Sequence, residues 1–269
     1  MTAVALFVGV VGLLFGSFAN VVIGRLPAGE SIVSPPSACP ACHHRIRPWD
    51  NIPVLSWLAL KARCRDCKAP ISPRYPLVEL AGGAGFTAVA LALPDHPLLW
   101  PAGCWVVFLA LTLTLIDLEH HRLPNALTLP ATPVLLALLA VPAAAYGMWD
   151  QWTTAALAGL ALFGLFGALW FAYPAGMGLG DVKLAPAIGV ALGWAGWSML
   201  AFGTFAMFLL GGLAGGVVMA VAARRHGANV RQTAKTGLPF GPFMFAGVLA
   251  AVCVGQSVIS WYAGFMPQG

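Results

Sequence analysis

Gly178-Leu179-Gly180-Asp181 places a carboxylate in a short loop between two long apolar runs, roughly 154–172 and 183–196. A charged side chain costs about 2.5–3.5 kcal/mol at the centre of a bilayer and less toward the interface, so Asp181 needs a reason to be there. Glycines on either side allow positive φ and the close approach of another chain. The simpler alternative is that Asp181 caps the helix that follows it.

The whole chain has the composition of a membrane protein. Of its 269 residues, 59% are hydrophobic and only 9% are charged, which excludes an ordinary soluble domain. A helix needs about 20 apolar residues to cross the hydrocarbon core. Eight continuous runs approach that length, at roughly 4–23, 76–93, 99–116, 125–145, 154–172, 183–196, 198–222 and 240–262. Continuous rather than alternating runs favour helices over a β-barrel, so we predict an all-α polytopic membrane protein with about eight transmembrane helices.

The basic residues predict how these helices are oriented. If the loop after the first helix is cytoplasmic, all fourteen Lys and Arg residues fall on the cytoplasmic side, as the positive-inside rule favours. The net charge of +5 therefore reflects topology in a lipid bilayer. No basic face with interleaved aromatic residues indicates binding to nucleic acid. We expect the first helix to be retained rather than removed as a signal peptide.

Residues 25–75 form the one sizeable polar segment, and they contain four of the six cysteines. The pairs Cys39-x2-Cys42 and Cys64-x2-Cys67 are separated by 21 residues, a spacing typical of a tetrahedral zinc site with four thiolates. A cytoplasmic location would keep the thiols reduced, although a redox pair or disulfides remain as alternatives. Because four thiolates leave no open coordination position, we expect a structural metal that orders a segment too short to build a core.

A second carboxylate, Asp117, lies near the end of the third apolar run, shortly before Pro124. The negative charge of Asp117 is disfavoured by the dipole at a helix C-terminus, so capping does not explain this residue. The predicted topology brings Asp117 and Asp181 to the same membrane face. Two carboxylates that share one site share a proton, so the charged one can activate water while the neutral one protonates a carbonyl oxygen. We expect Asp181, at a helix start, to be charged and Asp117 to hold the proton.

Glu79 lies in the stretch Ser72-Pro73-Arg74-Tyr75-Pro76-Leu77-Val78-Glu79, at the expected start of the second membrane helix. A carboxylate at the third helical position complements the helix dipole, and Pro76 suits the first turn. The alternative is a functional one, in which Glu79 faces the cytoplasm and binds a cationic group of a ligand.

These motifs together resemble the bacterial type IV prepilin leader peptidases. The resemblance rests on the Gly-x-Gly-Asp loop, on Asp117-Leu-Glu-His-His-Arg-Leu-Pro and on the two CxxC pairs. It extends to Arg74-Tyr-Pro-Leu-Val-Glu79, to the Gly-Ser-Phe-x-Asn-Val-Val-Ile-x-Arg-Leu-Pro stretch and to Pro-Phe-Gly-Pro-Phe. It therefore runs nearly end to end, and its motifs are specific in combination.

The resemblance implies a multi-pass aspartic endopeptidase of the bacterial inner membrane. Its substrates would be type IV prepilins and pseudopilins, which lose a basic leader after a glycine. Bifunctional members then methylate the new N-terminal residue, usually Phe, with S-adenosylmethionine. The family's catalytic aspartates correspond to Asp117 and Asp181, and its zinc ligands to Cys39, Cys42, Cys64 and Cys67. Because the chain keeps the four-cysteine segment, methyl transfer is expected too, with Glu79 as a candidate for its pocket.

This interpretation divides the chain into three parts. Residues 1–24 are the first helix, residues 25–75 the zinc-binding segment associated with methyl transfer, and residues 76–269 the peptidase core. The alternatives are a peptidase without methyl transfer, a metal or solute transporter, and a thiol oxidoreductase. A transporter would be expected to show repeats and midplane carboxylates, and an oxidoreductase would need its cysteines on the oxidising side.

Overall fold

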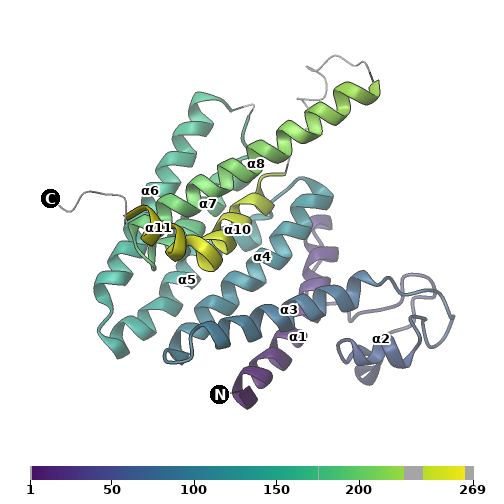
Figure 1. The fold of residues 1–269 in the computed structure, drawn as a ribbon. Helices are drawn as coiled ribbons and strands as arrows, with labels where there is room; N and C mark the ends of the chain where they lie inside the picture. The colour runs from purple at the N-terminus through teal and green to yellow at the C-terminus, as the bar shows by residue number, and fades with distance from the viewer. Residues whose placement is uncertain (1, 175, 227–238, 264–269) are drawn as a thin grey trace. The chain divides into compact units, whose positions relative to one another are not determined.

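A computed structural model describes residues 2–174, 176–226 and 239–263 of the chain, in which the regular secondary structure is helical and no strand occurs (Figure 1). The main helices are α1 (Thr2–Arg25), α2 (Leu55–Ala59), α3 (Arg74–Ala92), α4 (Trp100–His120), α5 (Asn125–Tyr146), α6 (Trp149–Ala172), α7 (Leu179–Gly193), α8 (Trp197–His226), α10 (Gly241–Ala250) and α11 (Gln256–Ala263). A π-helical turn at Ala251–Gly255 joins α10 to α11, and short 3-10 turns occupy Leu26–Ala28, Pro48–Asn51 and Pro97–Leu99. The predicted all-α class is confirmed.

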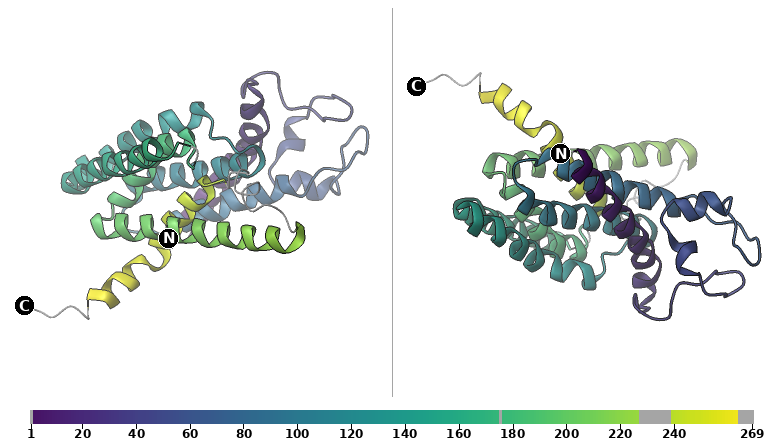
Figure 2. Two further views of the ribbon diagram at one scale, coloured as in Figure 1. Left: turned by 90° about the horizontal axis from the view of Figure 1, so that it is seen from above. Right: turned by 90° about the horizontal axis from the view of Figure 1, so that it is seen from below.

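The chain forms two compact units, Met1–Ile116 and Asp117–Gly269. In the first unit α1 and α3 pack side by side (Figure 2). Their glycines bring the two backbones into direct contact, because a Cβ at Gly12 would lie 2.5 Å from the Gly82 carbonyl oxygen and one at Gly16 would lie 2.6 Å from the Glu79 Cα. Small residues of this kind permit close helix packing in membranes.

Asn20 adds a polar contact between the same two helices. Its Nδ2 donates a hydrogen bond to the Tyr75 carbonyl oxygen at 3.1 Å. A hydrogen bond between helices in a membrane is worth about 0.6–2 kcal/mol. This contact fixes the C-terminal end of α1 against the start of α3.

In the second unit α7 is the central helix, and it contacts α5, α6, α8 and α10. Its close packing against α6 again depends on glycine. A Cβ at Gly189 would lie 2.5 Å from the Ala158 carbonyl oxygen, and one at Gly159 would lie 2.8 Å from Val190 Cγ2. The helix that follows the Gly-x-Gly-Asp loop is therefore enclosed by protein rather than by lipid.

Seven helices of the described residues are long and apolar enough to cross a membrane, against about eight expected runs. The difference is α7, which has 15 residues and spans only about 22 Å at 1.5 Å per residue. A helix enclosed by its neighbours does not need to match the hydrocarbon thickness of about 30 Å. Of the basic residues that define the predicted orientation, Arg231 and Lys235 lie outside the described residues, as do Gly237 and Leu238 before α10.

Candidate active site and metal centre

Asp117 lies one turn before the end of α4, as predicted, and its side chain is buried at 5% exposure. Its Oδ2 accepts a hydrogen bond of 2.9 Å from the backbone N–H of Gly241. Gly241 is the first residue of α10, and its N–H is one of the four that a helix start leaves without an intrahelical partner. A carboxylate in this position is stabilised by the positive end of the α10 dipole.

Asp181 is the third residue of α7, and its side chain is buried at 7% exposure. The N-cap of the helix is Gly178, so Asp181 is not itself the cap. Its carboxylate interacts with the Gly178 backbone N–H, in the manner of the carboxylate half of a capping box. The capping alternative put Asp181 just before the helix. The structure places Asp181 inside the first turn of α7, as its third residue.

The structure brings the two aspartates together within the second unit, close enough for the charge of Asp117 to act on Asp181. Leu123, in the loop after α4, packs against the start of α7 and the start of α10. A Cβ at Gly180 in α7 would lie 2.8 Å from Leu123 Cβ, and a Cβ at Gly241 in α10 would lie 3.4 Å from Leu123 Cδ2. Two carboxylates in one buried site can act as a base and an acid on opposite sides of a reacting carbonyl.

The role of Gly241 was missed in the sequence, although Pro-Phe-Gly-Pro-Phe was noted as a helix entrance. Gly241 and Asp117 are 124 residues apart, and a backbone N–H has no sequence signature. The expectation that Asp117 holds the shared proton rested on the α4 dipole alone. Because the start of α10 offsets that dipole, the helix dipoles do not indicate which of the two aspartates holds the proton.

Cys39, Cys42, Cys64 and Cys67 form one cluster, in which the four Sγ atoms all lie within 4.8 Å of one another. All four are free thiols, and the Cys39 and Cys67 sulfurs are 3.8 Å apart. Zn–S bonds of about 2.3 Å in a tetrahedron separate the sulfurs by about 3.8 Å. A disulfide requires about 2.05 Å. The donor set and its spacing therefore fit a four-coordinate metal ion.

The two CxxC pairs have the same local geometry. The Cys39 N–H donates to the His44 carbonyl oxygen and the Cys64 N–H to the Ala69 carbonyl oxygen, at 3.0 and 2.8 Å. The residue after the second cysteine of each pair has positive φ, 59° at His43 and 61° at Lys68. Each turn thus points two sulfurs inward. The sequence did not indicate this left-handed position, because neither residue is glycine.

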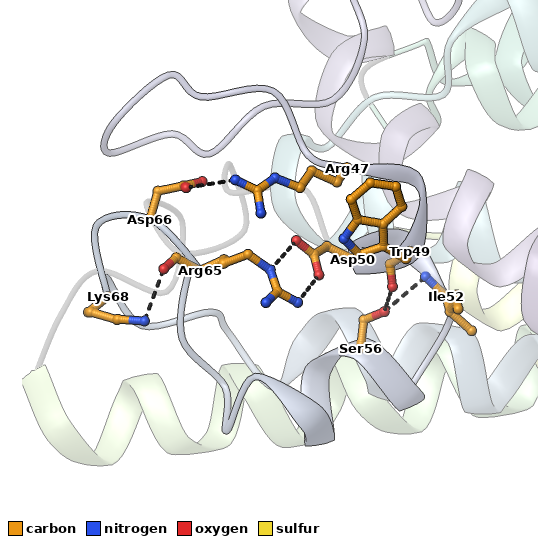
Figure 3. A network of polar contacts seen from close by, with 8 residues as sticks. All are labelled: Arg47, Trp49, Asp50, Ile52, Ser56, Arg65, Asp66 and Lys68. Atoms are coloured by element: carbon orange, nitrogen blue, oxygen red, sulfur yellow. Dashed lines mark hydrogen bonds and ion pairs between the residues drawn. The ribbon is translucent and has the colours of Figure 1, made fainter.

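Two ion pairs link the second cysteine turn to the residues after the first (Figure 3). Arg65 forms two hydrogen bonds to Asp50, at 2.7 and 2.6 Å, and Arg47 lies 3.4 Å from Asp66. The hydrogen bonds from Arg65 lower the pKa of Asp50. Arg65 and Asp66 are the two residues between Cys64 and Cys67, so these pairs help hold the two turns in register.

Glu79 is buried in α3 at 8% exposure. Its Oε2 accepts a hydrogen bond of 2.7 Å from the Val54 backbone N–H, and the Ser17 side chain also bonds to it. Glu79 is the sixth residue of α3, which begins at Arg74, so it does not cap its own helix. It instead joins the cysteine segment to α1 and α3.

Comparison with known proteins places the chain in a family. Residues 10–93 match the bacterial peptidase A24 N-terminal domain, and residues 104–223 match the type IV leader peptidase family. The chain is 33% identical to the prepilin leader peptidase/N-methyltransferase of Stutzerimonas stutzeri, over 95% of its own length and 92% of the relative's. The chain belongs to the prepilin leader peptidase/N-methyltransferase family.

Two further relatives named as prepilin leader peptidase/N-methyltransferase are similar over different lengths of the chain. The Burkholderia pseudomallei (strain K96243) protein is 36% identical over 93% of this chain and 85% of its own length. The Myxococcus xanthus (strain DK1622) protein is 51% identical over a shorter stretch, 47% of this chain and 37% of its own. No solved structure matches the chain significantly. The resemblance identified from the motifs is therefore confirmed at the level of the family.

In this leader peptidase the predicted residues fall into two groups. The four cysteines and Glu79 lie in the first compact unit, and Asp117 and Asp181 lie in the second. The two compact units are defined by contacts between residues. The three predicted parts, 1–24, 25–75 and 76–269, are defined by expected activity, so the two divisions are not directly comparable. The assignment of 25–75 to methyl transfer stays a prediction.

Proposed function

We propose that this protein cleaves the basic leader from type IV prepilins and pseudopilins after glycine, at the cytoplasmic face of the bacterial inner membrane. It then methylates the new N-terminal residue, usually Phe. The observation that carries the peptidase assignment is the buried pair Asp117 and Asp181 in a chain of this family. The family relationship gives no support to a metal or solute transporter.

The reaction follows from two carboxylates that share one proton. The charged aspartate takes a proton from a water molecule, and the water oxygen attacks the carbonyl carbon of the scissile amide. The protonated aspartate donates its proton to the carbonyl oxygen, which gives a tetrahedral diol. Collapse of the diol breaks the C–N bond as the first aspartate passes its proton to the leaving amine and the second aspartate takes a proton back from a diol hydroxyl, which restores the starting state of the pair.

The substrate's own chemistry supports the proposed orientation. A prepilin has a basic leader followed by an apolar helix, so its scissile bond comes to the membrane interface on the side where the leader remains. By the positive-inside rule, the fourteen basic residues of the enzyme favour a cytoplasmic position for the C-terminal end of α4 and the start of α7. The proposed active site and the scissile bond then lie at the same depth in the membrane.

S-Adenosylmethionine would supply an activated methyl group for the second reaction. Glu79 remains the candidate residue for that pocket. A carboxylate has about four lone-pair positions, and the Val54 and Ser17 contacts leave capacity for a further cationic group. In this role Glu79 would hold a positively charged part of the donor or of the substrate amine.

Mass spectrometry of one pilin, expressed with and without this protein, tests both activities. With the enzyme we expect the pilin to lose its leader mass and to gain one methyl group at its N-terminus. Leader loss without the methyl group would leave a peptidase only. An unshortened pilin in the presence of folded enzyme would overturn the proposal.

We expect zinc to be the metal held by Cys39, Cys42, Cys64 and Cys67, at about one ion per chain. Replacing Cys42 with Ser should release the metal, because three thiolates and a hydroxyl bind zinc far more weakly. The matched control is Cys253→Ser, since Cys253 is an exposed thiol outside the cluster. Metal analysis of reduced, purified protein checks this, and a folded sample without zinc would contradict it.

A further inference from the structure

Helix α2 carries two large apolar side chains that the described residues leave largely exposed. Leu55 is 64% exposed and Leu58 is 58% exposed. They are three residues apart on one short helix, so they lie on the same face. Trp49 and Ile52, just before α2, are also exposed. Such a group of apolar side chains is unusual in an otherwise polar segment and indicates a contact surface.

The turn before α2 is held in a fixed position. Val54 has φ of 62°, which is exceptional for a β-branched residue and requires support from its surroundings. The Val54 N–H donates to Glu79 in α3, the Ile52 N–H donates to Ser56 Oγ, and the Ser56 hydroxyl donates to the Trp49 carbonyl oxygen at 2.9 Å. Figure 3 shows Trp49 and Ile52 joined through Ser56.

The Glu79 contact determines the depth of α2 relative to the bilayer. Helix α3 has 19 residues, about 28 Å at 1.5 Å per residue, which is close to the hydrocarbon thickness of about 30 Å. Its first residue therefore lies near the interface. Glu79, five residues further on, lies about 8 Å along the axis from that start. A group hydrogen-bonded to Glu79 lies at the level of the headgroups and upper acyl chains, which is the depth that interfacial helices occupy.

We propose that α2 is an interfacial anchor that inserts Leu55 and Leu58 into the cytoplasmic leaflet. Leu77 and Leu80 of α3 are also exposed and lie within two residues of Glu79 on a helix long and apolar enough to span the membrane. The partner is an anionic phospholipid surface, because the basic residues Lys61 and Arg63 directly follow α2 and both are exposed. Apolar insertion together with basic flanks is the usual basis of interfacial binding.

Quenching by brominated lipids tests the anchor in the full-length protein. The fluorescent amino acid acridonylalanine, which is excited away from the native tryptophans, replaces Leu58 in one variant and Leu55 in another. The proteins are placed in nanodiscs of phosphatidylcholine and phosphatidylglycerol with bromine near the top of the acyl chains. We expect several-fold stronger quenching at both positions than at a control label at Arg45, an exposed residue beside the first cysteine turn.

A charge-reversal variant tests whether the basic residues after α2 contribute to membrane binding. Lys61→Glu combined with Arg63→Glu should reduce quenching at position 58 in mixed discs to the level seen in discs of phosphatidylcholine alone. A circular-dichroism spectrum that matches the wild type confirms that each variant is folded. Quenching at positions 55 and 58 no stronger than at position 45 would show that α2 is covered by protein or faces water, and would overturn the proposal. This result would not touch the peptidase assignment, which is measured by cleavage.

Discussion

Replacing Asp117 or Asp181 with Asn is expected to abolish leader removal, with a fall in the cleavage rate of at least about 10²–10⁴-fold. An amide of the same shape can neither take a proton from water nor donate one to the carbonyl oxygen. Both side chains are buried, and removing one charge from a site with two carboxylates relieves repulsion. Each variant should therefore fold and insert as the wild type does.

The measurement is the initial rate at which membranes containing each variant shorten a pilin precursor. Asp150→Asn is the matched control, because Asp150 is an exposed carboxylate in the first turn of α6. The predicted topology puts it on the opposite membrane face from the pair, so this variant should keep full activity. Normal processing by either active-site variant would refute the assignment of the pair.

Replacing Gly241 with Ala is the second large effect that we expect. The added Cβ would lie 2.8 Å from Asp117 Oδ2, so the carboxylate or the start of α10 must shift. The N–H that donates to Asp117 at 2.9 Å would then be misaligned. A misplacement of about 1 Å in a catalytic group can cost about 10²-fold in rate, and we expect a loss of kcat of that order with little change in KM.

Gly164→Ala in α6 is the control for this change. No atom lies within 4 Å of a Cβ built at Gly164, and an alanine in a helix is about 0.4–1 kcal/mol more favourable than a glycine. This variant should cleave at the wild-type rate. Equal rates for the Gly241 and Gly164 variants would show that the Gly241 contact does not position Asp117.

The cysteine cluster shows how far local spacing can predict a site. Two CxxC pairs separated by 21 residues can approach one another with little constraint from the rest of the chain, and the structure places all four sulfurs within 4.8 Å. The ion pairs of Arg65 with Asp50 and Arg47 with Asp66 were not predicted. Opposite charges are common in polar segments, and their pairing depends on the turn geometry.

Glu79 illustrates the limit of local reasoning. From the sequence it was either a helix cap or a ligand group, and both interpretations considered only its own helix. It accepts hydrogen bonds from Val54, 25 residues earlier, and from Ser17 in α1. A burial this deep requires partners, but the identity of those partners depends on the close α1–α3 packing through Gly12 and Gly16.

The sequence by itself determined the helical membrane class and the family, and it predicted the cysteine cluster and the two aspartates as candidate sites. Those features depend on hydrophobic run length and on short-range spacing, which are local properties of the chain. Only the tertiary structure decided that α7 is enclosed by other helices, that the start of α10 supports Asp117, and that Glu79 holds the turn before α2. These depend on backbone groups and close glycine contacts between distant segments, and a backbone N–H is the same in every residue that has one.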